Sequence, residues 1–393
     1  MRSTLGVKPA PATGVHLDPG ALVPSATPEA SGGIEHVEVP TRYDAVLLSG
    51  FGGPEGQDDV IPFLRNVTRG RGIPDERLEE VAHHYRHFGG VSPINDHNRE
   101  LRSALEDRLA QRGLPLPVIW GNRNWTPYLN DAIAEAFQRG FTRLLAIPTS
   151  AYSSYSSCRQ YREDWADALE DSGLAGTVAI DKVRPFFNHP GFVAPFVEGV
   201  RDAIAAAEAD GIGRSEIEVL FCTHSIPTLD AELSGVGGSY PAQHRSVAGY
   251  VMAQAAPEVA WQLVYQSRSG PPSQPWLEPD VNDAIQELQG RRGVILVPLG
   301  FVSDHMEVMW DLDTEAVETA TEAGLWVRRT PTPGVHPAFV DALADLVAER
   351  IEGRPAAQRG AVTAEGPWYD VCRPGCCENR RLGFKPAVAG LAP

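Results

Sequence analysis

Two residues that can handle protons and metal ions follow apolar segments of the chain. His224 comes after the apolar run Val219–Cys222, and Pro227 then favours a fixed turn. Histidine accepts protons near neutral pH and ligates metal ions, so this position suits either chemistry. The alternative is a histidine that only hydrogen-bonds to a neighbouring turn.

Glu307 follows a second apolar run, Val294–Val302, and begins a row of carboxylates with Asp311 and Glu315. On a helix, steps of four residues place all three on one face, where like charges repel unless a cation is present. Such a row at the mouth of a cleft suits a hard or borderline divalent cation. The alternative is an acidic helix face that water solvates.

Four of the five cysteines have a grouping that suggests a metal site. Three lie near the C-terminus, at Cys372, Cys376 and Cys377, and Cys158 lies far upstream. Four thiols suffice for a tetrahedral Zn²⁺ site or a [2Fe–2S] cluster, and the spacing alone does not choose between them or exclude free thiols. We interpret Cys222 as a buried core thiol.

Several loops carry hydroxyl, aromatic and basic groups suited to a flat ligand with carboxylates. Gly50–Pro54 is not a GxGxxG loop and no P-loop lysine follows it, so we expect a tight turn that lines a cleft. The run His83–His87 resembles a metal cluster, but exposed histidines on a helix are the preferred interpretation. The remaining loop groups are Tyr152, Tyr155, Tyr161, Arg69, Arg71 and Gly89–Ile94.

The elements that position these residues are short apolar segments alternating with helical patterns. This alternation is typical of parallel α/β sheets, in which ligands bind at the carboxyl ends of the strands. We therefore expect two similar halves, each with about four parallel strands, and a cleft between them. The predicted strands are Ala45–Leu48, Val118–Trp120, Leu144–Ile147, Thr177–Ile180, Val219–Cys222, Trp261–Tyr265, Val294–Val297 and Trp326–Arg328.

The length and net charge of the chain narrow the possible functions and locations of the protein. The chain has 393 residues and a net charge of −17, which argues against nucleic-acid binding. No apolar run reaches the roughly 18 residues of a membrane span, and the N-terminus lacks the apolar segment of a secretory signal, so we expect a cytoplasmic protein. We predict a disordered tail over 1–40, domains over 41–188 and 189–355, and an extension over 356–393.

Six stretches together resemble the ferrochelatases, and in particular the actinobacterial members that act on coproporphyrin III. The resemblance runs in the same order from about Asp44 to Arg350. It implies a chelatase-like fold of two Rossmann-like domains with a porphyrin cleft between them. The stretches are Asn66–Arg71, Phe88–Ile94, Thr223–Pro227, Gln266–Pro272, Pro275–Asp280 and Gly300–Asp313.

The resemblance implies an enzyme of haem biosynthesis that inserts Fe²⁺ into coproporphyrin III and releases two protons. His224 would be the base facing the pyrroles and a metal ligand, with Glu307 as its partner, and Asp311 and Glu315 would guide the metal. Phe51 stands where some relatives have a tyrosine that ligates product iron, and Thr68 where some have a propionate-binding arginine. The implied porphyrin contacts are Ser92, Tyr161, Arg69 and Tyr85.

The resemblance also favours the [2Fe–2S] cluster, held by Cys158, Cys372, Cys376 and Cys377. It implies coproporphyrin III and Fe²⁺ as substrates and a coproheme decarboxylase as a downstream partner, with no nucleic acid and no membrane span. Three alternatives stay open: a protoporphyrin IX ferrochelatase, a related cobalt or nickel chelatase, and a porphyrin- or haem-binding carrier or redox sensor without turnover.

Overall fold

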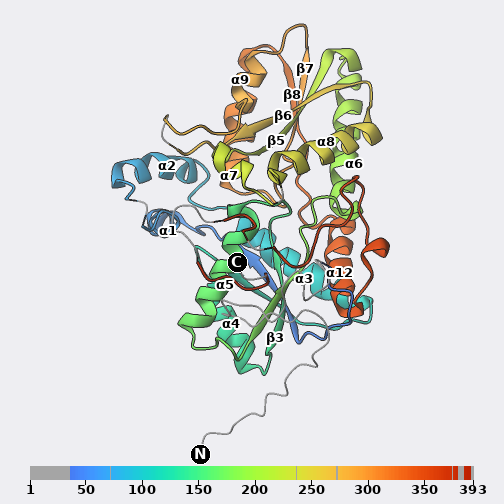
Figure 1. The fold of residues 1–393 in the computed structure, drawn as a ribbon. Coiled ribbons are helices and arrows are strands. Elements are labelled where there is room, and N and C mark those ends of the chain that lie inside the picture. The colour runs from blue at the N-terminus through green and yellow to red at the C-terminus, as the bar shows by residue number, and fades with distance from the viewer. Residues whose placement is uncertain are drawn as a thin grey trace, which may run out of the picture.

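The computed structural model describes residues 36–70, 72–235, 237–270, 273–373, 375–378 and 385–390. Two α/β halves lie one above the other, each built on a four-stranded parallel sheet (Figure 1). The strand orders are β2-β1-β3-β4 and β6-β5-β7-β8, so both sheets have the same topology. This arrangement confirms the fold class predicted from the sequence.

The first half places helices on both faces of its sheet. Its strands are almost wholly buried, as expected for apolar runs in a parallel sheet that is covered on both sides. The elements are β1 (Ala45–Gly50), a 3₁₀ turn (Gln57–Asp59), α1 (Val60–Val67), α2 (Asp75–His87), α3 (Ile94–Gln111), β2 (Val118–Asn122), α4 (Leu129–Gln138), β3 (Arg143–Pro148), the π-helix η2 (Tyr155–Arg159), α5 (Gln160–Asp171) and β4 (Ala179–Lys182).

The second half repeats the same alternation and also contains a π-helix. The elements are α6 (Pro190–Ala209), a 3₁₀ turn (Arg214–Glu216), β5 (Ile217–His224), α7 (Thr228–Glu232), α8 (Ser239–Ala255), β6 (Ala260–Gln266), α9 (Val281–Gln286), β7 (Gly293–Val297), α10 (Met306–Trp310), the π-helix η4 (Asp311–Ala316), α11 (Val317–Glu322), β8 (Trp326–Arg329), α12 (Pro337–Glu352) and a final 3₁₀ turn (Ala356–Gln358).

Helix α12 ties the two halves together. It packs against α6 and also against α3 of the first half, beside which it lies in Figure 1. Arg184, just after β4, donates two hydrogen bonds to the carboxylate of Glu349 on α12, at 2.9 and 3.1 Å. Both side chains are fully buried, so this ion pair fixes the last helix to the first sheet.

The first described residues pack against the segment that follows α12. The backbone N–H of Val37 donates to Asp370 at 2.7 Å, and Arg359 donates to the same carboxylate at 2.6 Å. Val37 is buried, so the packed chain begins before the boundary predicted at residue 40, and the rest of that predicted tail, residues 1–35, lies outside the described residues. Within the described ranges, no helix has the length and apolarity needed to cross a membrane.

Candidate active site and cysteine site

A cavity of about 500 Å³ lies between the two halves, beyond the carboxyl ends of both sheets. Parallel sheets place their ligands at this edge. The structure brings together most of the residues singled out from the sequence, whereas Arg69 and Glu315 are not among the lining residues. The predicted site residues that do line the cavity are Ser92, Tyr161, Tyr85, His224, Glu307 and Asp311.

His224 and Glu307 form the polar centre of this cavity. His224 is the last residue of β5, and Glu307 lies in the first turn of α10. The imidazole Nε2 is 3.6 Å from a carboxylate oxygen of Glu307, and Nδ1 contacts the backbone carbonyl of Ser225. The side chains are 32% and 49% exposed, so both groups can reach a ligand in the cavity.

His224 and Glu307 each shift the pKa of the other. Burial alone would lower the pKa of His224, but the Glu307 carboxylate and the Ser225 carbonyl raise it to about 9. Burial would raise the pKa of Glu307, but the charge of His224 holds it well below its ordinary value. At neutral pH the ligand-free site therefore contains an imidazolium beside a carboxylate. An incoming cation can replace the imidazolium as the partner of that carboxylate.

The three carboxylates of the predicted row have different surroundings. After Trp310 the chain forms the π-helix η4, and the charges of Glu307 and Glu315 both act on Asp311. Asp311 accepts hydrogen bonds from Ser267 and Gln266 and lines the cavity, and burial is the main cause that raises its pKa to about 7. Glu315 is exposed and instead accepts a hydrogen bond from the indole of Trp310 at 2.8 Å.

The opposite wall of the cavity comes from the first half. The phenol ring of Tyr161 lies under the guanidinium of Arg123, with 4.8 Å between the guanidinium carbon and the ring centroid. Arg123 is paired with Asp164 and also lies over Phe51, and sequence reasoning missed it. Its place just after β2, at the same edge as the other strand ends, was the signal that could have found it.

Ser92 reaches the cavity because a glycine gives it room. A Cβ atom on Gly53 would come within 2.7 Å of the Ser92 Cβ, so a larger residue there would displace the hydroxyl. The Ser92 backbone N–H donates to the carbonyl of Pro54 at 2.9 Å, which fixes the loop.

Burial and the nearby Glu307 charge raise the pKa of Tyr85, so its phenol stays neutral.

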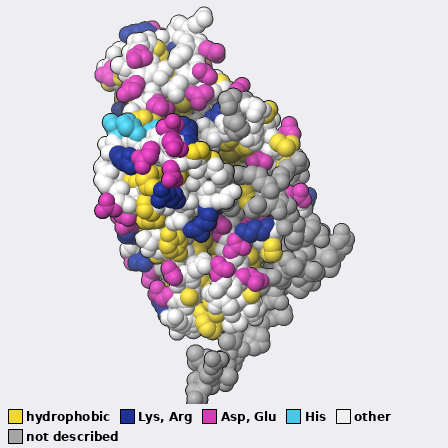
Figure 2. Space-filling view, turned by 90° about the vertical axis from the view of Figure 1, so that its left-hand side faces the viewer, with side chains coloured by type: hydrophobic (Ala, Val, Ile, Leu, Met, Phe, Trp, Pro, Cys, Tyr) yellow, Lys and Arg dark blue, Asp and Glu magenta, His cyan; other side chains and the backbone are white. Residues whose placement is uncertain are grey.

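The three histidines of α2 surround a tryptophan of the other half. The His84 ring stacks on Trp310 with 4.1 Å between centroids and an interplanar angle of 6°, while His83 and His87 meet the indole edge-on. Figure 2 shows histidine side chains gathered beside acidic ones on this face. Burial lowers the pKa of His84, so a neutral imidazole bridges α2 and α10, a packing role that the sequence did not indicate.

All four cysteines of the predicted metal site come together. Cys158 belongs to η2, next to the cavity wall, and the other three come from the C-terminal extension. All are buried, and the Cys376 and Cys377 sulfurs are 3.8 Å apart. Hydrogen bonding with Cys372 and Cys377 holds the pKa of Cys376 well below its usual range. Four soft donors in one buried cluster fit zinc or an iron–sulfur cluster.

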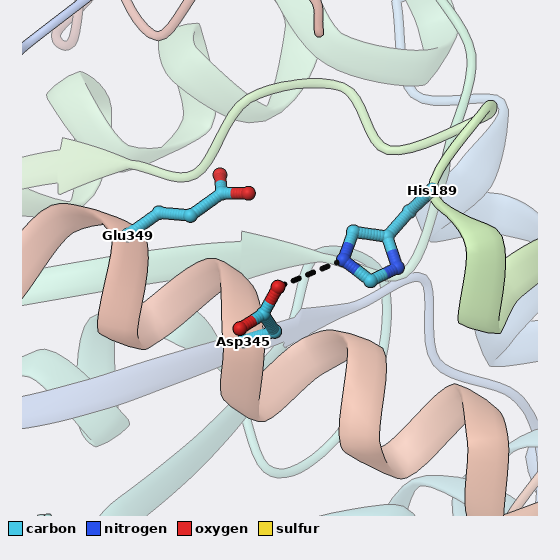
Figure 3. Close-up of side chains that lie close together, drawn as sticks. All are labelled: His189, Asp345 and Glu349. Atoms are coloured by element: carbon cyan, nitrogen blue, oxygen red, sulfur yellow. Dashed lines mark hydrogen bonds and ion pairs between the residues drawn. The ribbon is translucent and has the colours of Figure 1, made fainter. Parts of the chain in front are cut away.

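A second histidine–carboxylate cluster lies away from the cavity, where β4 leads into α6. His189, Asp345 and Glu349 lie close enough to hold a metal ion. Figure 3 shows one interaction among them, from His189 Nε2 to Asp345, at 3.3 Å. His189 Nδ1 accepts the N–H of Gly191 and caps α6, while guanidinium groups pair with both carboxylates. These partners make the cluster a structural ion-pair network.

The fold and the cavity together define a two-domain α/β protein whose cleft holds a histidine paired with a carboxylate. The ferrochelatase family profile matches residues 43–351, and the chain belongs to this family.

Named relatives agree with this assignment over nearly their whole length. The coproporphyrin III ferrochelatase of Leifsonia xyli subsp. xyli is 64% identical, covering 94% of this chain and 99% of that protein. The coproporphyrin III ferrochelatase of Streptomyces griseus subsp. griseus is 52% identical, covering 89% and 97%. The ferrochelatase of Rhodopirellula baltica is 48% identical, also covering 89% and 97%.

Proposed function

We propose that this protein inserts Fe²⁺ into coproporphyrin III to give Fe-coproporphyrin, with release of two protons. The observation that carries the proposal is the pairing of His224 with Glu307 inside the cavity between the sheets. The names of the Leifsonia and Streptomyces relatives support coproporphyrin III as the porphyrin. Insertion needs a base for the pyrrole N–H groups and metal ligands that release iron readily, and imidazole with carboxylate meets both needs.

His224 is the proposed base and a metal ligand. In the ligand-free site its proton is held by Glu307, which raises the pKa of the imidazole to about 9. When Fe²⁺ approaches Glu307, its charge opposes that proton, which passes to solvent because the His224 side chain is partly exposed, and His224 is left neutral. Its Nε2 lone pair is then free to accept a pyrrole proton, because Nδ1 stays bound to the Ser225 carbonyl.

Asp311 and Glu315 are the proposed guides for the metal ion. Asp311 lies in the cavity next to the His224–Glu307 pair, and Glu315 lies outside it on the next turn of η4. This order supports passage of a cation from the surface carboxylate to the cavity carboxylate. Oxygen ligands hold Fe²⁺ less firmly than thiolates would, so they favour transfer over retention.

Ser92, Tyr161 and Tyr85 are the proposed porphyrin contacts, supported by their place in the cavity wall. Arg69 remains a proposal for a propionate group, although its guanidinium donates to Asn66 at 2.7 Å and does not line the cavity. Phe51 lines the cavity and has no ligating atom, so we propose that product iron takes no protein ligand from this position.

The test of this function is a comparison of two porphyrins under anaerobic conditions. Steady-state insertion of Fe²⁺ should show a larger kcat/KM for coproporphyrin III, with four propionates, than for protoporphyrin IX, with two. Equal or reversed values would overturn the proposed substrate. The absence of insertion into either porphyrin, with tight haem binding, would instead indicate a carrier.

We also propose that Cys158, Cys372, Cys376 and Cys377 hold a [2Fe–2S] cluster. Supporting this, the Gly235 N–H donates to the Cys377 sulfur at 3.0 Å, and the Tyr369 hydroxyl lies 3.7 Å from the Cys376 sulfur. Backbone and hydroxyl donors of this kind stabilise thiolate ligands and tune iron–sulfur centres. The cluster would tie the C-terminal extension to η2; insertion itself transfers no electrons.

Metal analysis tests the cluster directly. The purified protein should be reddish brown and contain iron and acid-labile sulfide, and Cys376→Ser should lose the visible absorption. Cys222→Ala is the matched control, because Cys222 is a buried cysteine of β5 outside the site and its loss should leave the colour unchanged. A colourless protein with stoichiometric zinc would overturn the proposal.

A cytoplasmic location and a downstream decarboxylase belong to the same proposal. The product would keep all four propionates, so an enzyme that removes carboxyl groups from Fe-coproporphyrin must follow if haem is the end product.

A further inference from the structure

Two buried cations flank the cysteine site, and neither has a carboxylate partner among the described residues. Lys182 ends β4 and is 3% exposed, and Arg162 on α5 is 2% exposed. Across the described ranges, no ion pair involves either side chain. The Lys182 ammonium donates to the carbonyl of its neighbour Val183, at 3.4 Å. Buried charges are costly unless an opposite charge compensates them.

Arg162 is held beside the segment that carries the cysteines. Its Nε donates to the carbonyl of Val388 at 2.7 Å, and a Cβ on Gly390 would lie 1.7 Å from its Nη2. Gly390 forms a parallel bridge with Cys372, so the guanidinium lies under the segment that pairs with a cysteine. Its Nη1 is buried and has no hydrogen-bond partner among the described residues.

Both cations lie beside the cysteine site in the fold. Arg162 follows Cys158 by four residues, about one helical turn along η2 and α5. Lys182 shares a face of β4 with Ile180, which packs with Val388 and Ala389 of the segment that ends at Gly390. Such an arrangement suits an anionic occupant and would be unfavourable beside four neutral thiols.

We infer that Arg162 and Lys182 are the counter-cations of the cysteine site, where they neutralise an anionic iron–sulfur group and raise its reduction potential. The inference rests on the proposed cluster. Four thiolates, two sulfides and two ferric ions sum to two negative charges, which these two cations balance. Reduction adds one electron and a third negative charge, so nearby cations favour the reduced form.

The experiment measures the midpoint potential of the cluster in the purified full-length protein, by dye-mediated titration followed by visible absorption. Lys182→Met should lower the midpoint, so that at a fixed potential the ratio of reduced to oxidised cluster falls about tenfold, or 59 mV for a one-electron couple. Lys182→Arg should restore it. Lys385→Met is the matched control, because Lys385 lies on the same extension but is paired with Asp167.

Arg162→Gln should shift the midpoint in the same direction, and Lys182→Met keeps the test decisive if the arginine variant fails to fold. Loss of iron and sulfide from Lys182→Met, but not from Lys182→Arg or Lys385→Met, would also support the charge role. An unchanged midpoint in Lys182→Met with full iron and sulfide content would overturn this inference alone. A wild-type protein without iron and sulfide would overturn the proposed cluster and, with it, this inference.

Discussion

Two histidine–carboxylate pairs of this protein have similar geometry and different surroundings. His224 lies 3.6 Å from Glu307 in the cavity, and His189 lies 3.3 Å from Asp345 near the joint of the halves. The Asp345 carboxylate also accepts a hydrogen bond from Arg354 at 2.9 Å. Among the described residues, Glu307 forms an ion pair with His224 and with no arginine or lysine.

The two pairs differ in what neutralises their carboxylates, and this difference separates a structural pair from a pair that can bind a ligand. At the His189 pair, fixed cations neutralise the carboxylates and a backbone N–H occupies the second imidazole nitrogen, so no capacity is left for a ligand. At the His224 pair, the ion-pair partner of the carboxylate among the described residues is an imidazole, whose charge comes from a proton. A proton can be exchanged for a metal ion, whereas a guanidinium cannot leave. The His224 pair is thus suited to exchanging a proton for a metal ion, and the His189 pair to stabilising the fold.

The largest predicted effect on stability concerns the second cluster. Glu349→Gln leaves Arg184 as a buried charge without its carboxylate and should lower the free energy of unfolding by roughly 3–5 kcal/mol. Denaturant unfolding of the purified variant measures this. The kcat for iron insertion at low temperature should stay near wild type, and a large loss of kcat with normal stability would contradict the structural role.

Glu307→Gln should have the opposite effect, with a large loss of activity and little loss of stability. Loss of the carboxylate removes the proposed metal ligand and the group that stabilises the His224 imidazolium, and kcat/KM should fall about 10²-fold, or about 2.7 kcal/mol. The free energy of unfolding should change little, since the side chain is half exposed. Anaerobic kinetics and denaturant unfolding on the same sample check both parts, and near-normal turnover would contradict the assignment.

The pH dependence of kcat/KM should identify His224 as the base. A base must be unprotonated, so kcat/KM in the wild type should fall as the pH drops below the His224 pKa of about 9. In Glu307→Gln the largest cause that raises the imidazole pKa is lost while burial still lowers it, so this limb should move to lower pH. A limb that stays in place in the variant would mean that another group titrates.

The smallest effect is expected at His189. His189→Ala removes the cap of α6 and should cost about 1 kcal/mol with kcat unchanged. The hydrogen bond from His189 is the main cause that holds the pKa of Asp345 below its unfolded value. That stability is present above about pH 4 and is lost as the pH falls further, so the variant should lose less stability on acidification than the wild type. Equal acid sensitivity would contradict this account.

Much of the cavity could be predicted because strand ends are readable from sequence. His224 and Glu307 follow apolar runs, and parallel topology brings such ends to one edge. The π-helix after Trp310 could not be predicted, since periodicity gives no sign of a widened turn, and the same holds for the hydrogen bond from Trp310 to Glu315. Arg123 lacked a distinctive motif, although it too follows a strand end.

The cysteine site shows a different limit. Composition suggested that Cys158 joins the C-terminal cysteines, but its neighbours come from packing between segments far apart in the chain. Lys182 ends a strand and Arg162 lies in a helix, and only the fold places both beside the thiols. Local pattern cannot supply such long-range contacts, so the buried cations had no signal in the sequence.

The most direct test of the central claim is a single turnover of iron insertion in His224→Ala. Enzyme saturated with coproporphyrin III is mixed anaerobically with Fe²⁺, and absorption follows both bound porphyrin and product. The wild type should form one Fe-coproporphyrin per site, whereas His224→Ala should bind porphyrin normally and form product about 10³-fold more slowly. His189→Ala serves as the matched control and should behave as wild type. Insertion at the wild-type rate in His224→Ala would contradict the account.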